Sequence, residues 1–192
     1  MKFYYFNSWT IINQLSEILL KIGFSIKNTS RFILFLSSFC FAISAYLIVN
    51  KITSKEYLAL FISILMLIFQ KNLGDTDYPS LIISNHTYGM MSLAVSSLIF
   101  ALLINNFTKL AGFFSALLIC IHPVIGIWIL LISYISLVFF KEKKNRNDFI
   151  KGSSLGIIIT ILSFVDFFTQ NIGTISFNTQ NLNSYMQNWD GH

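Results

Sequence analysis

Long apolar runs separated by short polar segments make up most of the chain after residue 31. The run between Arg31 and Lys51 carries no charge and is long enough, at about 1.5 Å per helical residue, to cross a hydrocarbon core of about 30 Å. Further apolar runs cover residues 57–70, 88–104 and 152–168. The run over 57–70 is short for a crossing and depends on flanking lysines that reach to the interface.

The run over residues 110–140 contains no Asp, Glu, Lys or Arg and is too long for one crossing. As a single helix it would measure about 46 Å, whereas two full crossings need about 40 residues. Pro123 lies within it and cannot donate a helical hydrogen bond, but proline is favoured at the first position of a helix. We therefore expect one crossing helix to begin at His122 and Pro123. Residues 110–121 would then form a broken or re-entrant helix whose backbone is covered by protein.

The first 30 residues have a different pattern, in which apolar residues recur at helical spacing with polar residues opposite them. Trp9, Ile11 and Ile18 belong to the apolar face, and Gln14 and Glu17 to the polar one. We expect an amphipathic helix that lies in the membrane interface, either as an anchor before the first span or as a docking element. The chain is thus divided into an interfacial segment (1–30), a transmembrane bundle (31–168) and a polar tail (169–192).

Composition supports a membrane location. Of the 192 residues, 55% are hydrophobic and 11% are charged, whereas soluble domains carry about a quarter charged residues. The chain is therefore predicted to be an all-α membrane protein with about five transmembrane helices, multi-pass in the cell inner membrane. The net charge of +5 comes from basic residues beside the apolar runs, where such residues orient membrane helices. A nucleic-acid partner is not expected.

The basic residues also predict which helix ends face the cytoplasm. With the N-terminus inside, the inner segments hold most of the 13 lysines and arginines, including Arg31 and the basic loop 141–151. His122, Asp166 and the tail after residue 169 then lie on the outer side.

Ionisable side chains inside membrane helices are costly and commonly functional, so His122 and Asp166 are the first candidate site residues. His122 could carry a proton, act as a base or donate a hydrogen bond to an anionic substrate. The alternative is a neutral histidine that caps a helix start near the interface. For Asp166 the alternative is a solvated carboxylate at the membrane surface.

The segment "GDTDYP" at 74–79 contains the acidic pair Asp75 and Asp77, which the charge count places inside. Two carboxylates at this spacing can share a divalent cation, as sugar-nucleotide and lipid-phosphate enzymes require. Glycine, aspartate and proline are also the usual turn formers, and we favour that interpretation, so no metal site is assigned. His86 follows in "SNHTYG", where a solvated loop histidine is the alternative to a binding role. The sequence contains no nucleotide-binding or redox motif, and the cofactor is left open.

Gly152 and Gly156 form a G-x-x-x-G motif at the start of the last apolar run. This motif lets two membrane helices approach each other closely. We expect it to pack helices within the chain rather than between two copies, and the oligomeric state is left open. Cys40 and Cys120 lie in apolar runs, where they are expected to pack as small hydrophobic residues.

Three segments together carry a family resemblance: "GDTDYP" before a span, "HPVIGIW" in a later apolar run and "NWDGH" in the polar tail. In kind and order they resemble bacterial polytopic membrane proteins of the GT-C glycosyltransferase and polysaccharide-assembly type. The resemblance implies an enzyme that takes a sugar from a polyprenyl-phosphate carrier, with an acidic residue as base and an active site on the outer face. Such enzymes have about twice as many spans, and the sequence ends abruptly after "NWDGH". We therefore expect either the N-terminal part of a longer protein or a natural short form.

By this resemblance, Asp75, Asp77 and His122 are the candidate catalytic residues. The candidate substrate-binding residues are His86, Asp166, Trp189 and Asp190. The implied partners are membrane lipid and a polyprenyl-phosphate-linked sugar. The alternative is a non-enzymatic transporter or membrane-assembly subunit in which His122 and Asp166 handle protons or a polar substrate. A deep outer cavity would favour the enzyme, and a polar path through the middle of the bundle would favour the transporter.

Overall fold

The computed structural model describes residues 10–69, 88–140 and 142–171, and for Asp166 and the rest of the last helix it describes the backbone alone. Every regular element in these ranges is helical, which confirms the predicted all-α class. In chain order the elements are α1 (Ile11–Lys21), α2 (Ile26–Thr53), α3 (Glu56–Phe69), α4 (Tyr88–Ile104), α5 (Thr108–Leu117), the short 3-10 helix η2 (Leu118–Cys120), α6 (Pro123–Phe140) and α7 (Lys143–Asn171).

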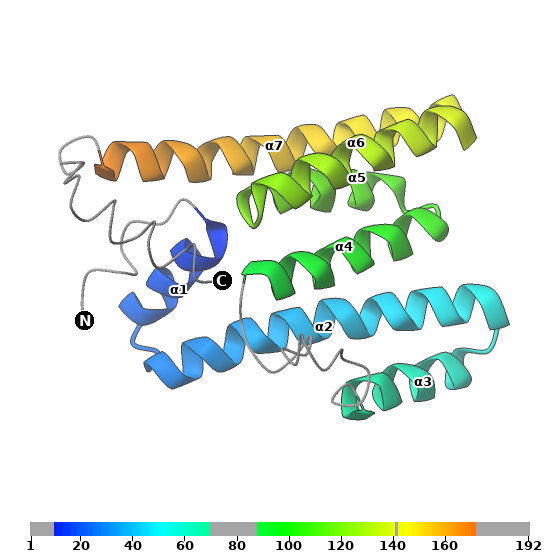
Figure 1. Ribbon diagram of the computed structural model, residues 1–192, viewed down its shortest axis with the longest axis horizontal. Coiled ribbons are helices and arrows are strands. Elements are labelled where there is room, and N and C mark those ends of the chain that lie inside the picture. Colours follow the sequence, from blue (N-terminus) through cyan, green and yellow to red (C-terminus); the bar gives the residue numbers. More distant parts are fainter. Residues whose placement is uncertain (1–9, 70–87, 141, 172–192) are drawn as a thin grey trace, which may run out of the picture.

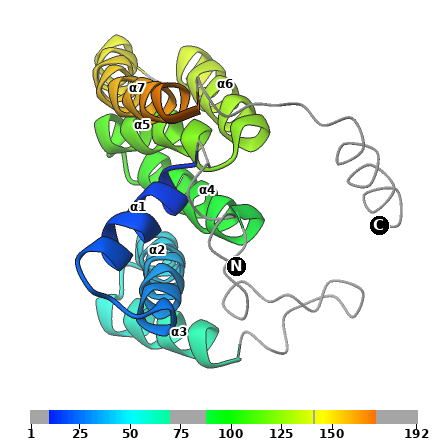
Figure 2. The same cartoon turned by 90° about the vertical axis from the view of Figure 1, so that its left-hand side faces the viewer.

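Helices α2 to α7 lie side by side with roughly parallel long axes and alternate in direction along the chain (Figure 1). α1 lies obliquely across one end of this bundle, which we call the α1 end, and we call the opposite end the far end. Viewed along the bundle, α5 lies between α7 and α4, α2 lies beyond α4, and α3 is outermost (Figure 2). Consequently α2, α4 and α6 begin toward the α1 end, and the α2–α3, α4–α5 and α6–α7 turns lie at the far end.

Local signals explain the sharp reversals between helices. At the end of α4, Asn106 has a left-handed conformation with φ of 62°. Its N–H donates to the carbonyl of Leu103 (3.1 Å), and the N–H of Phe107 donates to the carbonyl of Leu102 (2.9 Å). This Schellman-type ending satisfies the last carbonyls of α4 and turns the chain directly into α5. Gly23, with φ of 102°, ends α1 in the same way.

The long apolar run breaks where the proline predicts. α5 and η2 precede His122, and Pro123 is the first residue of α6, so the predicted break is confirmed. α5 nevertheless begins at the far end and finishes at the α1 end (Figure 1). Because the chain reverses at both Asn106 and His122, α5 is a leg of the bundle antiparallel to α4 and α6. Its predicted re-entrant course in a membrane stays a prediction.

This additional leg changes which basic residues lie together. Lys21, Lys27 and Arg31 belong to the α1–α2 region at the α1 end, whereas α7 begins with Lys143 at the far end (Figure 1). Arg31 and the described part of the segment 141–151 therefore lie at opposite ends of the bundle, whereas the charge count groups them together. The described basic residues near the far end are Lys51, Lys55, Lys109, Lys143, Lys144, Arg146 and Lys151. The predicted basic loop 141–151 is helical from Lys143 onward. α7 begins there, in the polar sequence that precedes the last apolar run.

The bundle has an apolar outside and small hydroxyl groups inside. Buried polar residues on the helices include Ser44, Ser63, Ser92, Ser96, Ser115, Ser133, Ser153 and Thr160. Large apolar side chains lie outside, such as Phe61, Trp128 and Leu162, each of which is about 60% exposed. Soluble proteins rarely expose such extensive apolar surface, whereas membrane helices pack through small residues and leave large ones to the lipid.

Two helices in the described ranges are long and apolar enough to cross a membrane, namely Ile26–Thr53 and Lys143–Val165. The remaining apolar helices are shorter: Glu56–Ile68, Met90–Ile104, Thr108–Cys120 and Pro123–Phe139. Together with the apolar exterior, these helices indicate that the protein associates with a membrane.

Glycines bring α5 and α7 into direct backbone contact. A Cβ atom on Gly152 would meet the carbonyl oxygen of Lys109, and one on Gly156 would meet that of Phe113. On the other side, a Cβ on Gly112 would meet the carbonyl oxygen of Phe149. The G-x-x-x-G motif therefore packs helices within the chain, as predicted.

Candidate functional site at the helix break

His122 occupies the N-cap position of α6. Its carbonyl accepts the N–H of Gly126 (2.8 Å), and its ring Nδ1 accepts the N–H of Ile125 (3.5 Å). Pro123 follows at the first helical position, where its missing N–H costs nothing. The geometry matches the capping role considered as the alternative for this histidine, although the ring accepts a backbone N–H rather than donating to a carbonyl.

The cap uses only one of the two ring nitrogens. In a neutral imidazole whose Nδ1 accepts a hydrogen bond, Nε2 carries the proton and is a donor. The side chain is partly exposed, and within the described residues its ring forms no other hydrogen bond. His122 therefore combines a structural hydrogen bond inside the turn with a donor directed away from it.

The turn that carries His122 is held rigidly against both neighbouring helices. A Cβ on Gly126 would lie 2.5 Å from the backbone nitrogen of Ile119, so the start of α6 requires glycine to pack against η2. On the α7 side, the Thr160 hydroxyl donates to the carbonyl of Ala116 (3.0 Å) and lies 3.7 Å from the Cys120 sulfur. These contacts fix the position of the histidine relative to α7.

The other predicted site residues lie in or beside parts of the chain that the structure does not describe. Asp75, Asp77, His86, Trp189 and Asp190 lie outside the described residues. Asp166 is in the last third of α7, toward the α1 end, and the structure describes its backbone but not its side chain.

Helix ends that adjoin these segments in the chain nevertheless lie at the same end of the bundle as His122. α4 begins at Tyr88, two residues after His86, and α7 finishes at Asn171, and both of these helix ends lie toward the α1 end, as does the start of α6 (Figure 1). The charge count had separated Asp75 and Asp77 from His122, but the helix that follows their segment starts at the histidine's end of the bundle. Within the described ranges, no group of three His, Cys, Asp or Glu residues could hold a metal ion.

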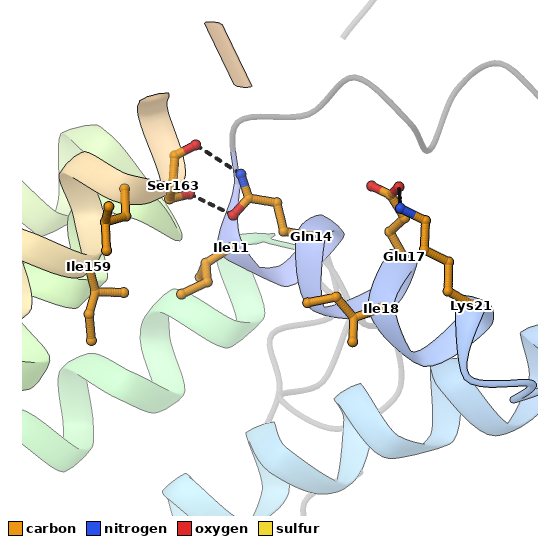
Figure 3. A pocket seen from close by; sticks show the side chains of 8 residues that line it. Ile11, Gln14, Glu17, Ile18, Lys21, Ile159 and Ser163 are labelled. Carbon is orange, nitrogen blue, oxygen red and sulfur yellow. Dashed lines mark hydrogen bonds and ion pairs between the residues drawn. The ribbon is translucent and has the colours of Figure 1, made fainter. Parts of the chain in front are cut away.

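Two of the surface grooves formed by the described residues lie elsewhere, and His122 lines neither of them. One of about 410 Å³ lies between α1 and α7 at the α1 end (Figure 3). The other, of about 350 Å³, lies between α4 and α6 and contains the buried Ser133, whose hydroxyl has no hydrogen-bond partner among the described residues.

The α1–α7 groove was not predicted from the sequence. Its polar centre is the pair Gln14 and Ser163, which are 149 residues apart in the chain. The available signals were a glutamine on the polar face of an amphipathic helix and a serine within the last apolar run. Neither residue indicates its partner without the tertiary structure.

No protein-family model, curated protein or solved structure matches this chain. The resemblance to glycosyltransferases of the GT-C type therefore remains a prediction.

Proposed function

We propose that the protein is a multi-pass protein of the inner membrane that binds the headgroup of a lipid-linked sugar at the α1 end of the bundle, in polysaccharide assembly. The observation that carries the proposal is the Nε2 of His122, which has no hydrogen-bond partner among the described residues and lies on a rigid helix start, at the end of the bundle where α4 starts and α7 finishes. The segments with Asp75, Asp77 and His86, and with Trp189 and Asp190, adjoin these helix ends in the chain.

The apolar exterior supports the membrane placement. α2 has 28 residues and measures about 42 Å, enough to cross the hydrocarbon core with a turn or more outside it. In this placement α2 to α7 form six legs among the described residues, of which α3 and α5 are too short to cross unaided. The far end, with most of the described basic residues, faces the cytoplasm, and His122 faces outward.

In the proposed site, the Nε2 proton of His122 donates to a phosphate oxygen of the carrier. Asp75 or Asp77 acts as the base for the accepting group, and His86, Asp166, Trp189 and Asp190 contact the sugar. Ionisable side chains near a membrane surface suit an anionic headgroup whose lipid tail stays among the apolar helices. A hydrogen bond to a charged group contributes about 1.5–3 kcal/mol, which is roughly a ten- to hundredfold change in affinity.

The decisive experiment separates the capping hydrogen bond at Nδ1 of His122 from the hydrogen-bond donor at Nε2. Asparagine caps helices well but has no imidazole Nε2, so His122→Asn should preserve thermal stability and weaken binding by roughly ten- to a hundredfold. His122→Ala should lose about 1 kcal/mol of stability as well. Binding of a short-chain polyprenyl-phosphate-linked sugar to the full chain in nanodiscs would be measured by thermophoresis.

The control is Ser25→Ala, which removes the N-cap of α2, where the Ser25 hydroxyl accepts the N–H of Asn28 (3.2 Å). It should lower stability without changing affinity. If His122→Asn binds the lipid-linked sugar as tightly as the unsubstituted protein, the proposed site is wrong and His122 is a cap alone.

A further inference from the structure

The groove between α1 and α7 has an apolar floor and a polar rim (Figure 3). Its apolar residues are Ile11 and Ile18 from α1, and Ile159 and Leu162 from α7. Ile18 is 52% exposed and Leu162 is 61% exposed, so the groove opens to the outside of the bundle. Its volume of about 410 Å³ is within the usual range of about 300–1,000 Å³ for small-ligand pockets.

Two hydrogen bonds between α1 and α7 hold the groove open at a defined width. The amide of Gln14 donates to the carbonyl of Ser163 (2.9 Å), and the Ser163 hydroxyl donates to the Gln14 amide oxygen (2.9 Å). Figure 3 shows this pair bridging the two helices above Ile11. A bridge that satisfies both ends of the amide is stable in an apolar setting, where an unpaired polar group would be costly.

The rim of the groove carries basic charge. Glu17 and Lys21 form an ion pair of 2.6 Å, in which Glu17 is largely covered and the Lys21 side chain is 69% exposed. Lys27 and Arg31 follow on the first turns of α2 at the same end of the bundle, and both are exposed. Among the side chains that the structure describes in this region, those of Lys21, Lys27 and Arg31 therefore outnumber the carboxylate of Glu17.

We propose that this groove binds one anionic membrane phospholipid, with an acyl chain against Ile18, Ile159 and Leu162 and the phosphate beside Lys21. The apolar floor matches the chain, and the basic rim is complementary in charge to the phosphate. Because α1 would lie at the membrane interface, its groove would be beside both the lipid headgroups and the adjoining part of the acyl chains. The inference depends on the membrane placement proposed above but on no step of sugar chemistry.

The test uses native mass spectrometry of the full chain released from micelles that contain equal amounts of phosphatidylglycerol and phosphatidylcholine. The unsubstituted protein should retain one phosphatidylglycerol in preference to phosphatidylcholine. Ile159→Trp fills the groove and should abolish retention. The matched control Ile161→Trp adds the same side chain to an exposed position outside the groove lining and should retain the lipid.

Two charge changes of opposite sign test the rim. Lys21→Gln should lower the preference for phosphatidylglycerol about fivefold, the effect of one basic residue near a lipid phosphate. Glu17→Gln removes the competing carboxylate and should leave the preference unchanged or raise it. Equal retention of the two lipids, or retention that survives Ile159→Trp, would overturn the proposal.

The same preparations distinguish this inference from the proposed function. His122→Asn should retain phosphatidylglycerol while losing affinity for the lipid-linked sugar. Ile159→Trp should do the reverse. If Ile159→Trp instead abolishes binding of the lipid-linked sugar and leaves phosphatidylglycerol retention intact, the groove belongs to the substrate rather than to a membrane lipid.

Discussion

Single residues show how closely α5 and α7 approach. At Gly152 there is no space for a side chain, because a Cβ atom would meet the carbonyl oxygen of Lys109. Thr160 and Ser153, farther along α7, donate to the carbonyls of Ala116 (3.0 Å) and Gly112 (3.3 Å). Small residues and hydroxyl donors on one stripe of α7 thus allow contact that larger side chains would prevent.

Gly152→Ala should therefore destabilise the bundle, although alanine is the better helix former. We expect a loss of about 1–3 kcal/mol, since the two backbones must separate to admit one methyl group. Thermal unfolding in detergent would measure the change. Ser154→Ala, at an exposed position on the same helix, is the control and should unfold like the unsubstituted protein. Equal unfolding temperatures for the two variants would show that the helices are not in backbone contact.

At the scale of elements, α1 is attached to the bundle through few contacts. It is a short amphipathic helix that ends at Gly23, and its hydrogen bonds to α7 include the two between Gln14 and Ser163. A helix of this length is marginal in isolation, so its order depends on packing against α2 and α7.

Gln14→Ala should release α1 from α7 without unfolding the bundle. Amides of α1 should then exchange hydrogen faster, whereas amides of α5 and α7 should stay protected, which hydrogen-exchange mass spectrometry can measure by segment. Ser16→Ala is the matched control, because the Ser16 hydroxyl donates to the carbonyl of Ile12 within α1 itself (2.8 Å). Exchange in α1 that is the same in both variants would mean that the Gln14 bridge does not hold the helix.

For the whole molecule, the main consequence of the fold is the separation of two basic regions. The start of α2 lies at the α1 end and the start of α7 at the far end, with the five described legs α2 to α6 between them (Figure 1). If the bundle crosses the membrane as proposed, these two helix starts face opposite sides, and the more basic far end faces the cytoplasm.

Cysteine labelling in spheroplasts tests this orientation. A cysteine at Lys27 should react with a membrane-impermeant maleimide, and a cysteine at Lys143 should react only after the membrane is opened. The unsubstituted chain, with Cys40 and Cys120 inside its helices, provides the background signal. Labelling of both positions from the same side would contradict the proposed arrangement of legs.

The sequence by itself determined the helical class, the approximate limits of the helices and the break at His122. These features depend on local physics. A run of apolar residues predicts a helix at Tyr88–Ile104 directly, and Pro123 favours the start of a helix because its ring lacks the N–H that an interior position needs. The internal role of Gly152 and Gly156 was also accessible, since their spacing places both on one helix face.

Only the tertiary structure decided the direction of α5, the pairing of Gln14 with Ser163 and the end of the bundle at which each charged segment lies. A short apolar helix has the same sequence pattern whichever way it runs against its neighbours. Its direction follows from the Asn106 reversal and from glycine contacts with α7, which is distant in sequence. One such leg moves every later segment to the opposite end of the bundle. Counting charges along the chain cannot register this reversal, because packing between distant helices sets it.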